Sequence, residues 1–164
     1  MPELTFEDDC LAPDRRILIT YNGPNAFEVY KKIKDIVKNT LHIGSSKYFE
    51  RDFRWDSTSG SFYIKIYAKH PIDNLTQGWY EIILEGQQPP NSDKGKLTIS
   101  IYPRLYTTLK LETPFQNSAI YKGFLMLYIK LFYRKTREKY LEMCRSLALK
   151  LERQIREMLG LPIS

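Results

Sequence analysis

The longest uniform pattern in this sequence is the helical one that follows Thr113-Pro114 and runs to about Leu159, where glycine and proline stop signals come next. At 1.5 Å per residue, a single helix over 114–160 would span about 60 Å or more. A five-stranded sheet is only about 20–25 Å across. The C-terminal helix must therefore overhang the rest of the fold or break in two, and we expect a break around Arg134–Lys139.

Five segments upstream of that helix show the alternation of apolar and polar residues that is typical of strands. They cover Arg15–Asn22, Lys47–Asp56, Ser61–Lys69, Trp79–Glu85 and Lys96–Leu111. The loops between the last four are short, which favours an antiparallel meander. Pro103 cannot donate a ladder hydrogen bond, so it predicts an edge, a bulge or a break in the last strand.

Between the first two strands, apolar residues recur at helical spacing over Asn25–Leu41, and Gly44 is placed to end that helix. The sequence therefore predicts an α+β fold: a curved antiparallel sheet of about five strands, one N-terminal crossover helix and a long C-terminal helix packed on the sheet. Residues 1–14 are expected to form an irregular arm, and residues 15–164 a single domain, with 114–160 as its basic C-terminal helix.

This order of elements, with an apolar final helix able to lie across a curved sheet, resembles the helix-grip architecture of START and polyketide-cyclase-like (SRPBCC-type) proteins. The resemblance covers most of the chain and rests on element order, without matching motif residues. It implies a cavity that holds a ligand between the sheet and the last helix, and it assigns no site residue. Members of the family usually have more strands and a second short helix before the meander.

Positive charge is concentrated at the C-terminal end of the chain. From Thr113 onward the sequence contains ten basic and four acidic residues, whereas residues 1–112 contain fifteen of each. Such polarity favours an anionic partner. The bases that we expect to contact nucleic acid are Arg134, Lys135, Arg137, Lys139, Arg145, Lys150, Arg153 and Arg156. Alternatively, these side chains only solubilise the helix by covering its apolar stripe.

The first part of the C-terminal helix, 120–133, is apolar on more than one face. A helix packed on a sheet needs only one apolar face, so the surplus indicates a second subunit, an apolar ligand or a membrane interface. We favour self-association, because the segment lacks a basic polar face of its own. The residues expected to serve self-association or an apolar ligand are Phe124, Leu127, Tyr128, Leu131 and Phe132.

Two patterns in the strands bear on function. Tyr63-Lys65-Tyr67-Lys69 and Tyr102-Arg104-Tyr106 place aromatics and bases on one face, as a platform for single-stranded nucleic acid requires. Alternatively, Glu81 and Glu85 pair with these bases in a cross-strand charge ladder, which is the reading we favour. A third group of aromatic residues, Phe49, Phe53 and Trp55, is expected to face the core.

No catalytic or cofactor motif is found, and the two histidines have no partner at metal-ligand spacing. The cysteines, Cys10 and Cys144, stand near opposite ends of the chain without a motif spacing, which predicts a reduced, cytoplasmic protein. No stretch of about twenty uninterrupted apolar residues is present, so we expect no membrane span. The sequence thus favours a non-enzymatic protein that binds RNA or a ribosomal particle through its basic helix and self-associates through 120–133. The alternative is a carrier of an apolar small molecule held between the sheet and the C-terminal helix.

Overall fold

A computed structural model of the 164-residue chain describes residues 3–12, 14–26, 28–91, 94–110 and 119–162. Its strands are β1 (Glu3–Asp9), β2 (Ile17–Pro24), β3 (Tyr48–Trp55), β4 (Ser61–Pro71), β5 (Thr76–Gln87) and β6 (Lys94–Lys110). Its helical segments are α1 (Val29–Leu41), the 3₁₀ turn η1 (Ser45–Lys47), α2 (Ala119–Tyr128), the π-helical turn η2 (Ile129–Tyr133) and α3 (Arg134–Leu159).

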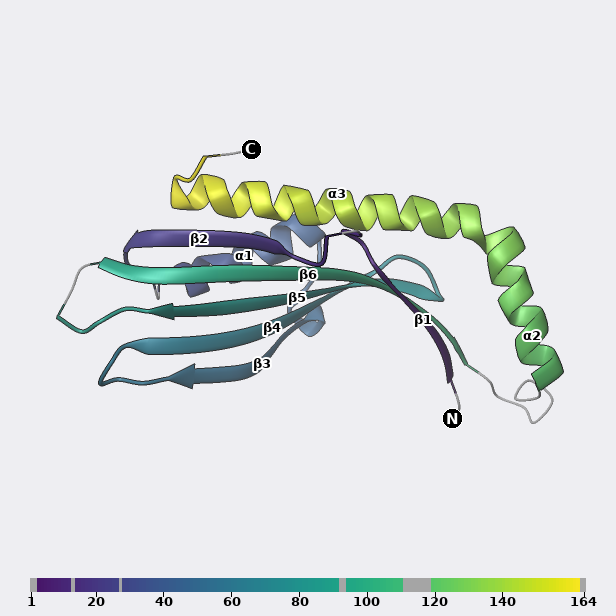
Figure 1. Cartoon of the computed structure of the whole chain (residues 1–164), viewed down its shortest axis with the longest axis horizontal. Coiled ribbons are helices and arrows are strands. Elements are labelled where there is room, and N and C mark those ends of the chain that lie inside the picture. The colour runs from purple at the N-terminus through teal and green to yellow at the C-terminus, as the bar shows by residue number, and fades with distance from the viewer. Residues whose placement is uncertain (1–2, 13, 27, 92–93, 111–118, 163–164) are drawn as a thin grey trace.

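The predicted α+β class is confirmed. Strands β3 to β6 form the expected antiparallel meander, and the sheet runs in the order β1-β6-β5-β4-β3, with β2 also paired to β6. Figure 1 shows α3 lying along the length of this sheet, above β2 and β6. The long C-terminal helix is thus confirmed over the described part of 114–160; residues 111–118 lie outside the described residues.

The expectation of an irregular arm over residues 1–14 is wrong, because this segment contains β1. Strand β6 is so long that β2 covers only its first half, up to Ile101. Strand β1 pairs with the second half, from Arg104 onward, and so it satisfies an edge that would otherwise be left open. Pro103 stands where one partner strand gives way to the other, and its carbonyl accepts a hydrogen bond from the Cys10 N–H at 3.1 Å.

Helix α1 is shorter than predicted at its N-terminal end. Asn25 has a left-handed backbone, with φ of 57°, so it cannot belong to a helical first turn, and the helix begins at Val29. At the other end His42, not Gly44, is the residue that takes the left-handed conformation, and its N–H donates to the Lys38 carbonyl. The predicted cap at Gly44 is therefore wrong by two residues.

The core lies on one face of the sheet, which α1 and α3 cover. Alternate residues of β4 and β5, such as Ile64, Ile66 and Ile82, are fully buried there. Tyr80 is also fully buried, and its hydroxyl lies 3.5 Å from the Cys144 carbonyl of α3. Around Tyr80 and Cys144, the protein's own side chains fill the space between the sheet and α3.

The prediction that Phe49, Phe53 and Trp55 share the core face is wrong. The register of β3 against β4 shifts between Glu50 and Asp52, so one extra residue interrupts the alternation. Phe49 pairs with Tyr67, an outward residue, whereas Phe53 and Trp55 pair with the inward Ile64 and Phe62. Because β3 is at the edge of the sheet, Phe53 and Trp55 stay exposed on that side.

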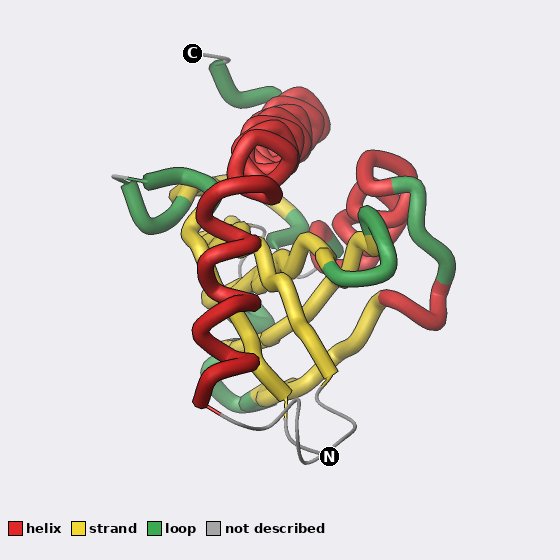
Figure 2. The backbone as a smooth tube through the Cα atoms, turned by 90° about the vertical axis from the view of Figure 1, so that its right-hand side faces the viewer, coloured by secondary structure: helices red, strands yellow, loops and turns green. Residues whose placement is uncertain are grey.

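The expected break in the C-terminal helix is confirmed, but it lies earlier than Arg134–Lys139. The π-helical turn η2 ends at Tyr133, and α3 is regular from Arg134 onward. A π-helical turn inserts an extra residue into the helical ladder and is a common cause of a sharp bend. Figure 2 shows α2 descending from the end of α3 at a steep angle.

The two cysteines are not reduced in this structure, which corrects the expectation from the sequence. Cys10 and Cys144 form a disulfide between the turn after β1 and the middle of α3, across 134 residues of sequence. Both cysteines are buried. The large separation in sequence gave no hint of this pairing, because only the fold brings the start of the chain beneath α3. The cytoplasmic location stays a prediction.

Candidate functional site

The candidate site is the elbow, by which we mean η2 and the first turn of α3, residues 129–137. Here the chain changes direction between an exposed apolar helix, α2, and the basic helix α3 (Figure 1). The elbow needs fixed contacts with the sheet, since a bend in a helix does not hold its angle by itself. Two side chains of the elbow, Tyr133 and Arg137, make these contacts.

Tyr133 joins the elbow to the loop before β5. Its hydroxyl donates to Asp73 Oδ2 at 2.8 Å and lies 2.8 Å from the Thr76 hydroxyl. Thr76 in turn lies 2.9 Å from the Thr107 hydroxyl of β6, and both threonines are buried. Each hydroxyl group in this chain has a hydrogen-bond partner, so the contact fixes the elbow without leaving one of these groups unsatisfied.

Arg137 joins the elbow to β1. Its guanidinium forms an ion pair with Asp8, donates to the Phe6 carbonyl at 3.2 Å, and donates to the Thr107 hydroxyl at 3.0 Å. Only 13% of the side chain is exposed. Arg137 was expected to contact nucleic acid; its guanidinium is occupied by an acid from the N-terminal strand, which counts against that contact.

The ionisation of Asp73 and Tyr133 follows from their contact. Burial by itself raises the pKa of Asp73, but hydrogen bonds from Tyr133 and from the N–H groups of Leu75 and Thr76 outweigh it and hold the pKa below its usual value. Burial, together with the Asp73 carboxylate, raises the pKa of Tyr133 to about 12. At neutral pH the pair is therefore a phenol that donates to a carboxylate.

This pair predicts a pH-dependent term in stability. Because the pKa of Asp73 is lowered in the folded state, its contribution is present above the unfolded value near 4 and is lost as the pH falls through the folded value. We expect Asp73→Asn to cost about 1 kcal/mol at pH 7, a small effect because the carboxylate is exposed. Urea unfolding at pH 7 and near pH 3 should show the difference from wild type shrinking with acid; a difference that grows with acid contradicts the assignment.

The remaining predicted bases divide into two groups. Arg134 pairs with Glu138 and Arg156 with Glu152, each within α3 at 3.0 Å. The others are exposed and form no ion pair with the described residues; we call them the basic ridge, and they are Lys135, Lys139, Arg145, Lys150 and Arg153. The N-terminal part of the protein therefore neutralises one of the eight predicted bases, while five remain open to a partner.

The predicted apolar residues are exposed where the structure describes their side chains. Phe124, Leu127, Tyr128 and Leu131 are between 51% and 66% exposed, while the side chain of Phe132 lies outside the described residues. Helix α2 has no buried residue. We call its exposed large side chains, with Leu131 of η2, the apolar tip: Ile120, Phe124, Met126, Leu127, Tyr128 and Leu131.

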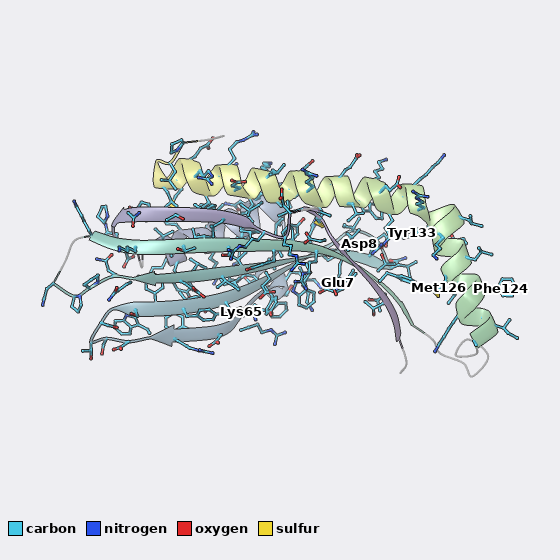
Figure 3. All side chains as sticks on the ribbon, viewed as in Figure 1. Glu7, Asp8, Lys65, Phe124, Met126 and Tyr133 are labelled. Atoms are coloured by element: carbon cyan, nitrogen blue, oxygen red, sulfur yellow. A yellow bond between two sulfur atoms is a disulfide. The ribbon has the colours of Figure 1, made fainter. Side chains whose placement is uncertain are left out.

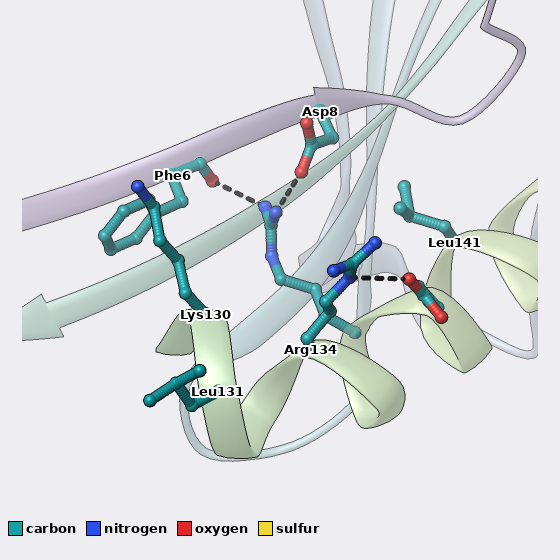
Figure 4. Close-up of a pocket in the computed structure, with 8 residues that line it drawn as sticks. Phe6, Asp8, Lys130, Leu131, Arg134 and Leu141 are labelled. Carbon is teal, nitrogen blue, oxygen red and sulfur yellow. Dashed lines mark hydrogen bonds and ion pairs between the residues drawn. The ribbon is translucent and has the colours of Figure 1, made fainter. Parts of the chain in front are cut away.

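A groove of about 580 Å³ opens at the elbow between β1 and α3. Phe6, Leu131 and Leu141 supply apolar walls. The ion pairs of Arg137 with Asp8 and of Arg134 with Glu138 also line the groove. Figure 4 shows Lys130 extending toward Phe6. The groove is thus lined both by Leu131, from the predicted apolar residues, and by Arg134 and Arg137, from the predicted nucleic-acid-binding bases.

Sequence reasoning missed the residues that hold the elbow, namely Phe6, Asp8, Asp73, Thr76, Thr107 and Tyr133. Asp8 is part of an acidic N-terminal run in the sequence, and this run was the one available signal that an acid from that end meets a C-terminal base. The threonines and Asp73 have no such signal. Their roles depend on loops and strands that only the tertiary fold brings together.

The outer face of the sheet carries part of the charge ladder that we favoured over a stacking platform, since Glu81 pairs as expected but Glu85 forms no ion pair with the described residues. Lys65 pairs with Glu81 of the neighbouring strand at 3.2 Å. Arg104 pairs with Glu7 of β1 at 2.8 Å, rather than with an acid of β5. Figure 3 shows Lys65 low on the sheet, away from α3, and Glu7 next to Asp8. Acids between the bases of this face disfavour phosphate binding there.

Within the described residues, no group of three or more His, Cys, Asp or Glu side chains is placed to bind a metal ion. No helix of the described chain has both the length and the apolar character to cross a membrane.

Comparisons with known proteins identify no family. No family model and no curated protein matches the chain. A solved structure titled "DELTA-ENDOTOXIN" has a TM-score of 0.30 and 10% identity, covering 70% of this chain and 64% of that one, which is less than two thirds of its length. "Structure of Protein of Unknown Function SA2116 from Staphylococcus aureus" has a TM-score of 0.25 and 11% identity, covering 88% and 95%. Likeness of this degree says nothing about function.

Proposed function

We propose that this protein is a non-enzymatic binding protein whose basic ridge contacts RNA, alone or within a ribosomal particle. The observation that carries the proposal is that five exposed bases of α3 have no acidic partner among the described residues. Between Lys135 and Arg153 they extend over about 27 Å at 1.5 Å per residue. Lysine and arginine heads along such a length neutralise phosphates without reading the base sequence.

The scaffold that presents the ridge supports this proposal. The buried residues Cys144, Ala148, Leu151 and Ile155 hold α3 on the core, so its opposite face is turned to solvent along its length. The order of strand, helix, meander and long C-terminal helix also fits the helix-grip resemblance, which we propose as the architecture. Strand β1 is an addition to the order we expected, whereas α2 is the first part of the expected broken C-terminal helix. The alternative of an interior carrier remains a prediction, and the burial of Tyr80 between β5 and α3 counts against it.

A salt titration tests RNA binding. We expect a fluorescently labelled RNA hairpin to bind the full chain with an affinity that falls about 100-fold between about 50 and 200 mM salt, as four or so phosphate contacts require. Changing the ridge bases Lys135, Lys139, Lys150 and Arg153 to Gln should make log K against log salt shallower by about 3. Fluorescence anisotropy measures both quantities.

The matched control changes four exposed lysines of α1 and η1 to Gln, namely Lys31, Lys32, Lys34 and Lys47. This variant has the same net charge as the ridge variant, and we expect it to keep most of the affinity and the salt dependence. Equal losses in the two variants, or no binding by the wild type at low salt, reject the ridge as an RNA contact.

A further inference from the structure

The apolar tip contains six of the twelve exposed large hydrophobic side chains of the described chain. Ile120 is 70% exposed, Phe124 66% and Leu131 65%. Soluble proteins rarely expose contiguous apolar patches of large side chains unless the patch contacts a protein, a ligand or a membrane. The tip is also set apart from the body, since the elbow turns α2 away from the line of α3 (Figure 1).

The apolar surface of the tip is wider than one partner helix needs. Ile120, Phe124, Leu127 and Leu131 follow the 4-3-4 spacing of a seam between two helices. Met126 is two residues from Phe124, hence on a nearly opposite side, and it is exposed as well. Figure 3 shows Phe124 and Met126 projecting from opposite sides of α2. A lipid surface contacts such a helix over a wider arc than a single partner helix does.

The basic residues near the apolar tip favour an anionic partner over a second copy of the chain. Residues 119–139 contain six bases and one acid, Glu138, which is paired with Arg134. Lys130, Lys135 and Lys139 are exposed, and in the sequence Lys130 precedes Leu131 directly while Lys135 and Lys139 follow it by four and eight residues. Two copies joined through their tips would bring these bases close together, which is unfavourable. The sequence alone showed no basic face on 120–133, but the elbow joins this segment directly to the bases of early α3.

We propose that the apolar tip docks on the surface of a membrane that contains anionic lipids. The apolar side chains of α2 enter the boundary between headgroups and acyl chains, and Lys130, Lys135 and Lys139 contact the lipid phosphates. The fifteen described residues of α2 and η2 extend about 22 Å, less than the roughly 30 Å of a bilayer core, so the segment lies in the interface. This proposal does not rest on RNA binding.

Tyr133 and Arg137 give the docked orientation a structural basis. Both fix the elbow to the sheet through Asp73, Thr76 and Asp8, so insertion of α2 fixes the orientation of the whole domain. The far half of the basic ridge, at Lys150 and Arg153, lies on α3 away from the tip. It therefore stays free for a second partner while the tip is docked.

Vesicle flotation tests the proposal with the full chain and without RNA. We expect co-flotation with phosphatidylcholine vesicles that contain about one third phosphatidylglycerol, and at least tenfold weaker partition onto pure phosphatidylcholine. The double change Phe124→Ser and Leu127→Ser should weaken partition about 100-fold or more. Changing Lys130 and Lys135 to Gln should weaken partition onto the anionic vesicles about thirtyfold.

Matched variants keep the outcomes distinct. Met143→Ser with Leu149→Ser removes two exposed apolar side chains from α3, and Lys150→Gln with Arg153→Gln removes two distant bases; both should float as the wild type does. No flotation on anionic vesicles, or equal flotation on neutral ones, overturns the proposal. Sedimentation equilibrium that shows a dimer lost in the Phe124/Leu127 variant, without flotation of the wild type, assigns the tip to a second copy and also overturns it. Failure of the RNA titration leaves these results unaffected.

Discussion

Replacing Cys10 and Cys144 together by alanine should lower the free energy of unfolding by about 4 kcal/mol. The disulfide closes a loop of 134 residues, and a cross-link that closes so long a loop restricts the unfolded chain by more than 4 kcal/mol in the chain-entropy account. It also joins the turn after β1 to the middle of α3, two elements that no short connection holds together. Urea unfolding of the oxidised wild type and of the double variant measures the difference.

Reduction of the wild type provides the control for the packing cost of the alanines. The reduced protein keeps both buried sulfur atoms, so the oxidised-to-reduced difference isolates the cross-link. We expect the reduced wild type and the double alanine variant to agree within about 1 kcal/mol. Two thiols that react in the purified, non-reduced, native protein, or a stability unchanged by reduction, contradict the role that the structure gives to this bond.

Arg137→Gln should lower the free energy of unfolding by about 3 kcal/mol. The substitution leaves Asp8, the Phe6 carbonyl and the Thr107 hydroxyl without their shared donor. Removing one partner of a buried ion pair typically costs 3–5 kcal/mol; Arg137 is largely buried but Asp8 is 45% exposed, which places the expectation at the low end. Thermal and urea unfolding measure the loss.

The matched control is Arg134→Gln, one turn earlier on the same helix. Its partner Glu138 and its own side chain are exposed at 59% and 75%, so the change should cost less than about 0.5 kcal/mol. A double-mutant cycle with Asp8→Asn should give a coupling energy of about 1 kcal/mol or more. Equal effects at Arg134 and Arg137, or zero coupling to Asp8, contradict the described function of Arg137 as the link between α3 and β1.

The meander could be predicted from the sequence because each strand shows its own alternation. Ser61–Lys69 alternates without interruption, and its inward residues are the buried ones. Lys47–Asp56 alternates as well, but an extra residue between Glu50 and Asp52 reverses the faces halfway along. A bulge of this kind leaves the composition unchanged, so a period-two pattern cannot reveal it.

Contacts between residues far apart in the sequence account for most of the other differences between the predicted and the observed structure. Residues 3–9 have little strand pattern, and they become β1 because the second half of β6 needs a partner. The disulfide and the Arg137–Asp8 pair both depend on that placement. The charges of the basic ridge, in contrast, were visible in the sequence, since an exposed helix face needs no tertiary partner to be exposed.

We propose that the C-terminal helices carry the binding surface while the sheet acts as a scaffold. Lysine acetylation followed by mass spectrometry, with and without the RNA hairpin, tests it most directly, because every exposed lysine reports at once. We expect RNA to protect Lys135, Lys139 and Lys150 of α3 and to leave Lys65 and Lys69 of the outer sheet face unchanged. Protection of the sheet lysines, with those of α3 still modified at their original rate, would contradict the claim.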